Sequence, residues 1–298
     1  MVKSNLILYL LGNKGLRVLE ALIDAGFTPA IKAVIFAPDK AVRKDYSEEI
    51  TALCLLNNIP VWSRTSLEAS SLKSEYAMAI GWRWIIDKTQ HHRVIVFHDS
   101  LLPKYRGFAP LVSQLINGET TIGVTVLFAV DEYDKGPIIS QRSVDIKYPI
   151  KVDSAIKAII PLYQEQALTV LENITDNIPL VGLDQDESQA SYSVWRDDKD
   201  LQIDWGLSGQ VIRRLVDATG FPFNGAYTML DGRRIELMEV EEVEDLHLEF
   251  RHVGKTIRFD DEMPVIICGS GMLKVVSARW YDSKENIAKW PRFRMRFE

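Results

Sequence analysis

Short apolar runs alternate with amphipathic segments through the amino-terminal half of the chain. Buried strands are predicted for the apolar runs at residues 5–11, 31–36, 60–62, 76–81, 94–98 and 123–129, with a further extended segment at 138–146. Helices are predicted where apolar residues recur at helical spacing, at 16–25, 47–57, 67–74 and 109–117. Strands that alternate with helices in this way indicate an α/β fold with a Rossmann-like, mostly parallel sheet.

A long helical pattern and then a polar stretch follow. Residues 152–175 have helical spacing, and Pro161 inside them removes a backbone hydrogen bond, which predicts a kink or a break. Residues 184–204 are polar and charged, which predicts a linker. Within it, residues 192–196 (YSVWR) are too aromatic for a free tether, so we expect them to pack against the first domain.

The chain changes character after Trp205. One helical pattern at 208–219 precedes only short alternating runs, and Asp231-Gly232 is a signal for a type I′ hairpin. These features predict a smaller β-rich, barrel-like (OB-like) domain. The predicted organisation is therefore a first domain at 1–183, a linker at 184–204 and a carboxy-terminal domain at 205–298.

An edge strand or part of a homodimer interface would explain the alternation of apolar and basic residues around Trp290, Phe293, Met295 and Phe297.

Composition narrows the class of protein. The 298 residues are 47% hydrophobic and 26% charged, as in ordinary water-soluble proteins. No apolar run approaches the roughly 18 residues that span a bilayer, so we expect no membrane contact and a cytoplasmic location. Cys54 and Cys268 are isolated in apolar surroundings, which favours buried thiols. His, Cys and carboxylate residues do not cluster at ligand spacing, so no metal site is expected.

Net charge argues against a nucleic-acid partner. The chain carries a formal charge of -6, and residues 206–298 hold 14 Lys and Arg against 15 Asp and Glu. Proteins that bind nucleic acid usually present a basic face to its phosphates. The carboxy-terminal domain is instead close to neutral.

Candidate chemistry gathers where the strand at 94–98 ends. Ligands of α/β sheets bind outside the carboxyl ends of the strands, which is where His98 would lie. Asp134, in the acidic cluster after the next β-like run, is a candidate partner, although a carboxylate before Lys135-Gly136 also suits a plain turn. Asp99 should point to the opposite face of the strand. His91 and His92 lie in a polar stretch and are expected at the surface.

The stretch HDSLLPKYRG at 98–107 resembles the signature of folate-dependent formyltransferases, whose pattern is Asn-x-His-x-Ser-Leu-Leu-Pro before a glycine turn. GVTV at 123–126 and DEYDKG at 131–136 fit the second half of that signature, in which the family's aspartate falls on Asp134. LQIDW at 201–205 and FPFNGA at 221–226 are similar to the start of the carboxy-terminal domain that methionyl-tRNA formyltransferases share with sugar N-formyltransferases.

One position departs from that signature. The family's catalytic asparagine stands two residues before the histidine, where this chain has Val96. An asparagine amide donates to the oxyanion that forms when an amine attacks a formyl carbonyl, and removing one such donor typically lowers the rate by about 10²- to 10³-fold. Either a backbone amide, His98 or a residue from elsewhere replaces the donor, or the chain is slow or acts on an unusual substrate.

The resemblance implies a role for each of several residues. The first domain would be the catalytic domain, and N10-formyltetrahydrofolate the cosubstrate. His98 would take the proton of the amine and later return it to the departing folate nitrogen, while Asp134 orients the imidazole. The residues implied around the pterin are Trp82, Arg83, Trp84, Ile85, Leu102, Tyr105 and Asp131.

The form of residues 192–197 is closer to that of the sugar enzymes, so the expected acceptor is the amine of a nucleotide-linked amino sugar. By position and chemistry, the candidate residues for this substrate are Asn13, Lys14, Tyr192, Trp195 and Arg196. A solvated loop lysine and a linker arginine bonded to the domain surface are the plainer readings of Lys14 and Arg196. The alternatives are a methionyl-tRNA formyltransferase, or a homologue of low activity that binds folate or nucleotide, because Val96 replaces the asparagine.

Overall fold

The computed structural model describes residues 5–40 and 42–298, so the first four residues of the predicted first domain lie outside the description. The chain divides into two compact units. The first comprises Met1–Leu111, Thr120–Ile146 and Ser154–Trp195, and the second comprises Val112–Glu119, Lys147–Asp153 and Arg196–Glu298. Of the predicted linker, residues 184–195 therefore belong to the first unit and residues 196–204 to the second.

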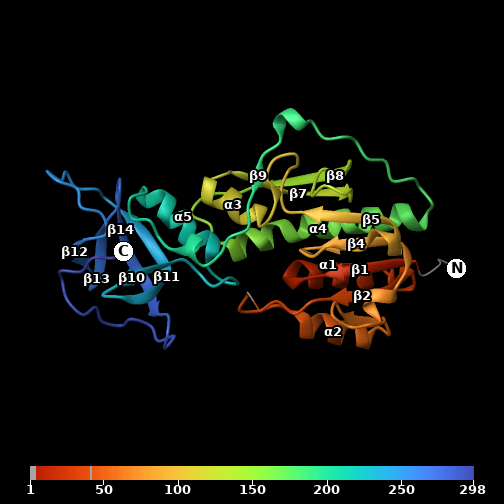
Figure 1. Cartoon of the computed structure of the whole chain (residues 1–298), viewed down its shortest axis with the longest axis horizontal. Coiled ribbons are helices and arrows are strands. Elements are labelled where there is room, and N and C mark those ends of the chain that lie inside the picture. The colour runs from red at the N-terminus through yellow and green to blue at the C-terminus, as the bar shows by residue number, and fades with distance from the viewer. Residues whose placement is uncertain (1–4, 41) are drawn as a thin grey trace. The chain divides into compact units, whose positions relative to one another are not determined.

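A seven-stranded sheet forms the first unit, in the order β3-β2-β1-β4-β5-β7-β8 (Figure 1). Its strands are β1 (Leu6–Leu10), β2 (Ile31–Phe36), β3 (Val61–Ser63), β4 (Ser74–Ile80), β5 (His91–His98), β7 (Thr121–Phe128) and β8 (Ile138–Asp145). The five strands from β3 to β5 run parallel, whereas β7 pairs antiparallel with β5 and with β8. The predicted Rossmann-like, mostly parallel sheet is confirmed.

Helices cover one face of this sheet. α1 (Gly12–Asp24) packs on β1 and β4, and α2 (Ser47–Leu56) packs on β2 and β3. Tyr163 of α4 (Val152–Thr175) stacks on Phe97 of β5 with ring centroids 5.7 Å apart. The opposite face carries an apolar cluster to which β1, β2, β4 and β5 all contribute.

The helix predicted at residues 67–74 is wrong, and the helix predicted at 152–175 has no break at its proline. Residues 67–74 form only a 3-10 turn at Ala69–Ser71, because Leu67 is exposed and the segment has no continuous apolar face to bury. α4 runs through Pro161 without a break. Its apolar side chains on both sides of the proline, including Ile159 and Ala167, are fully buried, so packing outweighs the lost hydrogen bond.

His91 is not a surface residue. It is only 6% exposed, and its ring nitrogens share hydrogen bonds with the hydroxyl groups of Tyr9 at 2.9 Å and Ser74 at 2.8 Å. Burial lowers the pKa of His91, which favours the neutral ring. The polar sequence around it suggested exposure, but His91 begins β5 and turns inward, whereas His92 is exposed as expected.

A curled antiparallel sheet forms the second unit, in the order β10-β11-β14-β13-β12. Its strands are β10 (Tyr227–Leu230), β11 (Arg233–Val243), β12 (Thr256–Asp260), β13 (Met263–Ile267) and β14 (Met272–Trp280), and α5 (Gly209–Thr219) packs on β11 and β14. Asp231 and Gly232 have φ of 50° and 75°, as a type I′ hairpin requires. The predicted β-rich, barrel-like domain is confirmed.

The end of the chain completes this curved sheet. Phe297 bridges to Leu230 beside β10, and Arg296 bridges to Lys255 beside β12, so the last residues lie between the two outer strands. Trp290, Met295 and Phe297 are buried in the core of the unit, whereas Phe293 is exposed. Of the two explanations for the apolar alternation, the strand-like pairing at 296–297 is the one observed.

Both cysteines are buried and free, as expected. Burial raises the pKa of the Cys54 and Cys268 thiols to about 12. Within the described residues, no helix is long and apolar enough to cross a membrane.

Asp217, in the last turn of α5, carries a buried carboxyl group. The residue is 7% exposed. It forms an ion pair with Arg213, whose Nε lies 3.8 Å from Oδ2 of Asp217. Burial raises the pKa of Asp217 to about 6, helped by the charge of Glu239 and opposed by Arg213 and Lys151. A negative charge at a helix C-terminus is also unfavourable. The ionised form of Asp217 therefore destabilises the fold.

We expect Asp217→Asn to raise the free energy of unfolding at pH 7.5 by about 1 kcal/mol, a value discounted for partial solvent screening. Because the folded pKa lies above the unfolded one, the parent gains stability as the pH falls through about 6, and the difference between the two proteins vanishes near pH 4. Urea unfolding at both pH values measures this, with Glu242→Gln as the control. A variant less stable than the parent at pH 7.5 would contradict the assignment.

Candidate active site

The carboxyl ends of three neighbouring parallel strands meet at one edge of the sheet. β1 ends at Leu10, β4 at Ile80 and β5 at His98, and the Leu11 amide donates to the Ile80 carbonyl at 3.1 Å. The connection order of the sheet reverses between β1 and β4, which is the place where open α/β sheets bind ligands. His98 thus stands at the binding edge, as predicted.

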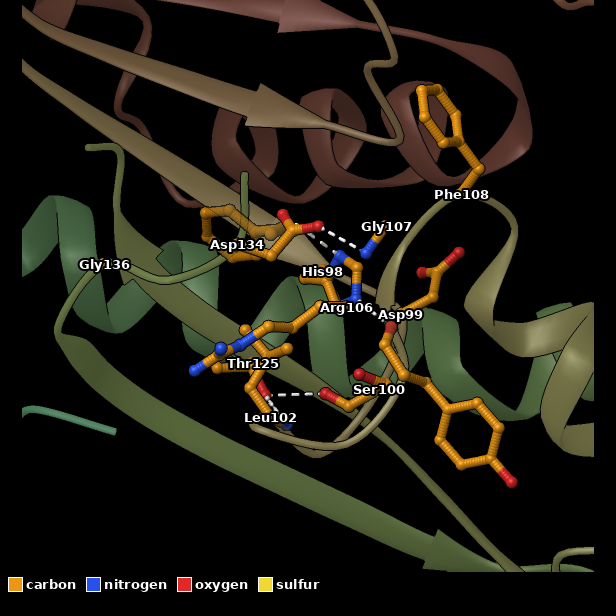
Figure 2. Close-up of polar contacts among 12 residues, drawn as sticks. His98, Asp99, Ser100, Leu102, Arg106, Gly107, Phe108, Thr125, Asp134 and Gly136 are labelled. Atoms are coloured by element: carbon orange, nitrogen blue, oxygen red, sulfur yellow. Dashed lines mark hydrogen bonds and ion pairs between the residues drawn. The ribbon is translucent and has the colours of Figure 1, made fainter. Parts of the chain in front are cut away.

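His98 has one nitrogen committed to a backbone group. It is 7% exposed, and its Nε2 donates to the Tyr105 carbonyl at 2.8 Å. A carbonyl oxygen only accepts, so Nε2 carries a proton in every ionisation state that keeps this bond. The other nitrogen, Nδ1, lies 3.5 Å from Oδ1 of Asp134 (Figure 2). The atom at which the ring can exchange a proton is therefore the one beside the carboxylate.

Asp134 is held in a tight turn. Its φ of 56° is left-handed, and its Oδ2 accepts a hydrogen bond of 2.8 Å from the Gly107 amide. A Cβ at Gly136 would overlap the Phe128 carbonyl oxygen, so only glycine fits the close return of the turn to β7. Asp134 is a turn residue, as the plainer reading held, and that same turn directs its carboxylate at His98.

Hydrogen bonds fix the loop that follows His98. The Thr125 hydroxyl donates to the Ser100 carbonyl at 2.6 Å and accepts from the Leu102 amide at 3.0 Å (Figure 2). The Gln141 side chain donates to both the Leu102 carbonyl and the Thr125 hydroxyl. The loop is therefore anchored to β7 and β8 before it reaches Tyr105, which explains how a loop carbonyl can orient the imidazole.

Residues 184–195 run along this loop, and we call them the strap. β6 (Arg106–Gly107) pairs in parallel with β9 (Tyr192–Ser193), and the Tyr105 amide donates to the Ser191 hydroxyl at 2.9 Å. The prediction that residues 192–196 pack against the first domain holds for residues 192 and 193. Sequence reasoning missed Arg106 and Gln185, which link the strap to the loop, because their partners are remote along the chain.

Asp99 points to the helical face, as expected from strand alternation. It forms an ion pair with Lys14 in the first turn of α1 and accepts a hydrogen bond from the Tyr163 hydroxyl of α4. Burial opposes ionisation of Asp99, but the charge and hydrogen bond of Lys14 outweigh it and hold the pKa of that carboxyl below its usual value. Burial and the Asp99 charge raise the pKa of Tyr163 well above 10.

The aromatic candidates for the pterin site lie in the loop after β4. Trp82 packs edge-on against Tyr9 and Trp84, with ring centroids 5.2 and 5.0 Å away. The Trp82 indole nitrogen is buried and has no hydrogen-bond partner among the described residues. Arg83 forms an ion pair with Asp39 and lies over the Trp84 ring.

The other pterin candidates fall in different surroundings. Ile85 is 81% exposed, whereas Leu102, within the loop that follows His98, is buried. Tyr105 contributes its carbonyl to His98. Asp131 is exposed, forms an ion pair with Lys88 and is not brought into contact with His98.

The substrate candidates are not brought together. Asn13 lies in the first turn of α1, and its Oδ1 is buried without a partner among the described residues. Tyr192 and Trp195 are exposed, and the Tyr192 hydroxyl accepts from Arg106 at 3.4 Å. Arg196 belongs to the second unit, where it donates to the Ser113 hydroxyl at 2.8 Å, so the plainer reading of this linker arginine describes its contact.

Val96 offers no polar group at the position of the family's asparagine. Its side chain packs against the apolar cluster that contains Tyr9 and Ala79, on the same face of the sheet as Trp82. No three His, Cys, Asp or Glu side chains within residues 5–40 and 42–298 are grouped so as to hold a metal ion.

We expect Lys14→Met to lower the free energy of unfolding by about 3–5 kcal/mol, because it leaves the Asp99 carboxylate buried without its cation. The double variant Lys14→Met/Asp99→Asn should recover most of that loss. Urea unfolding measures both, and Arg17→Met, on the exposed side of α1, is the control. If Lys14→Met unfolds like the parent, Lys14 is not tied to Asp99 and is free to meet a phosphate.

Comparisons with known proteins find matches in both halves of the chain. A model of the formyl transferase family matches residues 65–160, and a model of the formyl transferase C-terminal domain matches residues 197–290. The methionyl-tRNA formyltransferase of Streptococcus agalactiae is 30% identical over 224 residues, which cover 70% of this chain and 71% of that protein.

Solved structures share the fold. WlaRD, a sugar 3N-formyl transferase in the presence of dTDP and 5-N-formyl-THF, superposes with a TM-score of 0.66 at 18% identity, over 97% of this chain and 100% of that one. HypX from Aquifex aeolicus gives a TM-score of 0.61 at 18% identity over 94% of this chain, which spans 45% of HypX. The two family models together cover more than half of the residues, and the chain belongs to the formyl transferase family.

Proposed function

We propose that this chain is an N-formyltransferase that moves the formyl group of N10-formyltetrahydrofolate to the amine of a nucleotide-linked amino sugar. The observation that carries the proposal is the pair formed by His98 and Asp134 at the carboxyl end of β5. A histidine that can gain and lose a proton beside a fixed carboxylate is what transfer to an amine requires.

His98 would accept the amine proton at Nδ1. The 3.5 Å between Nδ1 and Oδ1 of Asp134 is too long for a direct hydrogen bond, and a substrate N–H placed there can reach both atoms. Once the ring is protonated, each of its N–H groups faces an acceptor, the Tyr105 carbonyl on one side and Asp134 on the other. The same proton is then available for the leaving nitrogen.

The folate supplies the formyl group and a nitrogen that leaves once it is protonated. The loop after β4 is suited to hold its pterin, because Trp82 and Trp84 offer aromatic surface and the buried Trp82 N–H lacks an acceptor. Arg83, Ile85, Leu102, Tyr105 and Asp131 complete the proposed folate set. Val96 donates nothing to the formyl oxygen, so groups other than the residue-96 side chain must stabilise it.

The choice of acceptor rests on charge and on exposed aromatic residues. Residues 206–298 are near neutral, which suits a small substrate better than the phosphates of tRNA. Tyr192 and Trp195 of the first unit are exposed and can stack on a nucleotide base, and Asn13 and Lys14 of the same unit are the remaining proposed substrate residues. Lys14 would contribute only through its ion pair with Asp99.

Methionyl-tRNA formyltransferase is the second candidate, favoured by the 30% identity to the Streptococcus agalactiae enzyme. A homologue that binds folate or nucleotide without turnover is less well supported, because a pure binder has no use for both His98 and Asp134.

Incubation of the protein with N10-formyltetrahydrofolate and dTDP-linked amino sugars should add the mass of one formyl group to a sugar nucleotide. We expect His98→Asn to lower kcat by about 10²- to 10⁴-fold. His92→Asn, an exposed histidine on the same strand, should leave kcat unchanged. Product with methionyl-tRNA and none with any sugar would overturn the acceptor, and full turnover by His98→Asn would overturn the mechanism.

A further inference from the structure

We propose that Gln185, on the strap, is the positioning residue that sets the geometry of Asp134, with Arg106 holding Gln185 in the orientation this requires. The inference rests on the proposed function, because Gln185 would affect the reaction by positioning Asp134 for the proton transfer at His98. Gln185 touches no reacting group, and it acts through the turn that carries Asp134.

Every hydrogen-bonding group of the Gln185 amide is used. Its nitrogen donates to the Asp134 carbonyl at 2.7 Å and to the Gly136 carbonyl at 2.8 Å. Its oxygen accepts two hydrogen bonds from Arg106, of 3.1 Å from Nε and 2.8 Å from Nη2. A flipped amide would face two carbonyls with its oxygen and a guanidinium with its NH₂ group, so only one orientation is satisfied.

Arg106 is fully buried and has acceptors at each nitrogen of its guanidinium. Besides Gln185, Glu187 accepts from Nη1 at 2.9 Å and from Nη2 at 2.7 Å, and the Tyr192 hydroxyl accepts at 3.4 Å. The hydrogen bond to Glu187 raises the pKa of Arg106 further. A planar cation with this fork of acceptors fixes their mutual positions, so it makes the strap a rigid support.

Hydrogen bonds connect Arg106, Gln185, Asp134 and Gly107 into a closed ring. Arg106 reaches the Asp134 main chain through Gln185. The next residue, Gly107, donates its amide to the Asp134 carboxylate (Figure 2). Asp134 is thus fixed at its backbone and at its side chain from one short segment. Its left-handed φ of 56° is a conformation that a non-glycine residue keeps only when its surroundings hold it.

Loss of the Gln185 donors should therefore displace the carboxylate from His98. Gln185→Glu keeps the size of the side chain and the contact with Arg106 but presents oxygen to two carbonyls. We expect kcat to fall by about 10- to 100-fold, since small misplacements of reacting groups cost this much. KM for both substrates should change less than about twofold. If Gln185→Glu does not fold, Gln185→Asn takes its place. Its side chain is too short to reach the turn, so kcat should fall by a similar factor.

The control and the partner variant separate positioning from general destabilisation. Gln189→Glu makes the same change on an exposed part of the strap and should leave kcat unchanged. In an Asp134→Asn background, Gln185→Glu should cause no further loss of kcat, because the carboxylate that it positions is already gone. A loss of equal size in both backgrounds, or full kcat in folded Gln185→Glu, would overturn the proposal.

Hydrogen exchange of the Gly107 amide tests the geometry without turnover. Protection of this amide should fall at least tenfold in Gln185→Glu and in Asp134→Ala, which removes the acceptor, but stay at the parent level in Gln189→Glu. If no acceptor is formylated, the proposed function fails, while this exchange result still decides whether Gln185 positions Asp134. Unchanged Gly107 protection in Gln185→Glu would overturn the positioning role.

Discussion

The hydrogen bond from His98 Nε2 to the Tyr105 carbonyl determines how the site can work. It fixes which nitrogen of the imidazole keeps its proton and leaves Nδ1 as the exchanging atom. Because Nδ1 faces Asp134, the atom that would accept the proton in the proposed reaction and the carboxylate that would stabilise the resulting cation lie on the same side of the ring. The hydrogen bonds of Thr125, Gln141 and Ser191 to the loop help to keep that carbonyl in place.

Residues remote along the chain hold the loop in place, and this arrangement requires the burial of a charged side chain. Arg106 brings a full positive charge into a buried position, which is tolerated only because its donors meet the strap. Gly107 lies so close to the strap that an added Cβ would overlap the Ser193 carbonyl oxygen. The site is therefore an assembly of the strand end, the loop, the turn at Asp134 and the strap, and no one segment defines it.

Much of this could be predicted from the sequence, for physical reasons. Alternating strands and helices have strong local periodicity, and His98 stands at a strand end that such a sheet must place at its binding edge. The signature motif then gave Asp134 its partner. Local patterns do not show which polar residues turn inward, so the predicted surface position of His91 is wrong. Its burial depends on Tyr9, which is remote along the chain.

The contacts of the strap could not be predicted from the sequence for the same reason. Gln185 lies in a polar, acidic stretch whose composition indicates only a linker, and its bonds to Asp134 span 51 positions. The position of Lys14 makes it a candidate for the nucleotide-linked substrate, but its ion pair with Asp99 follows from the meeting of α1 with the end of β5, which no spacing reveals. Pro161 shows the reverse case, in which packing of a long helix overrides a local rule.

The protonation state of the His98 ring tests the central claim most directly. Two-bond ¹H–¹⁵N correlation spectra of the protein labelled with ¹⁵N-histidine distinguish the two neutral tautomers, and the spectrum of His98→Asn assigns the signal. With the Tyr105 carbonyl as acceptor, neutral His98 should carry its proton on Nε2, and only the Nδ1 signal should move strongly as the ring titrates. A neutral ring protonated on Nδ1 would contradict the account.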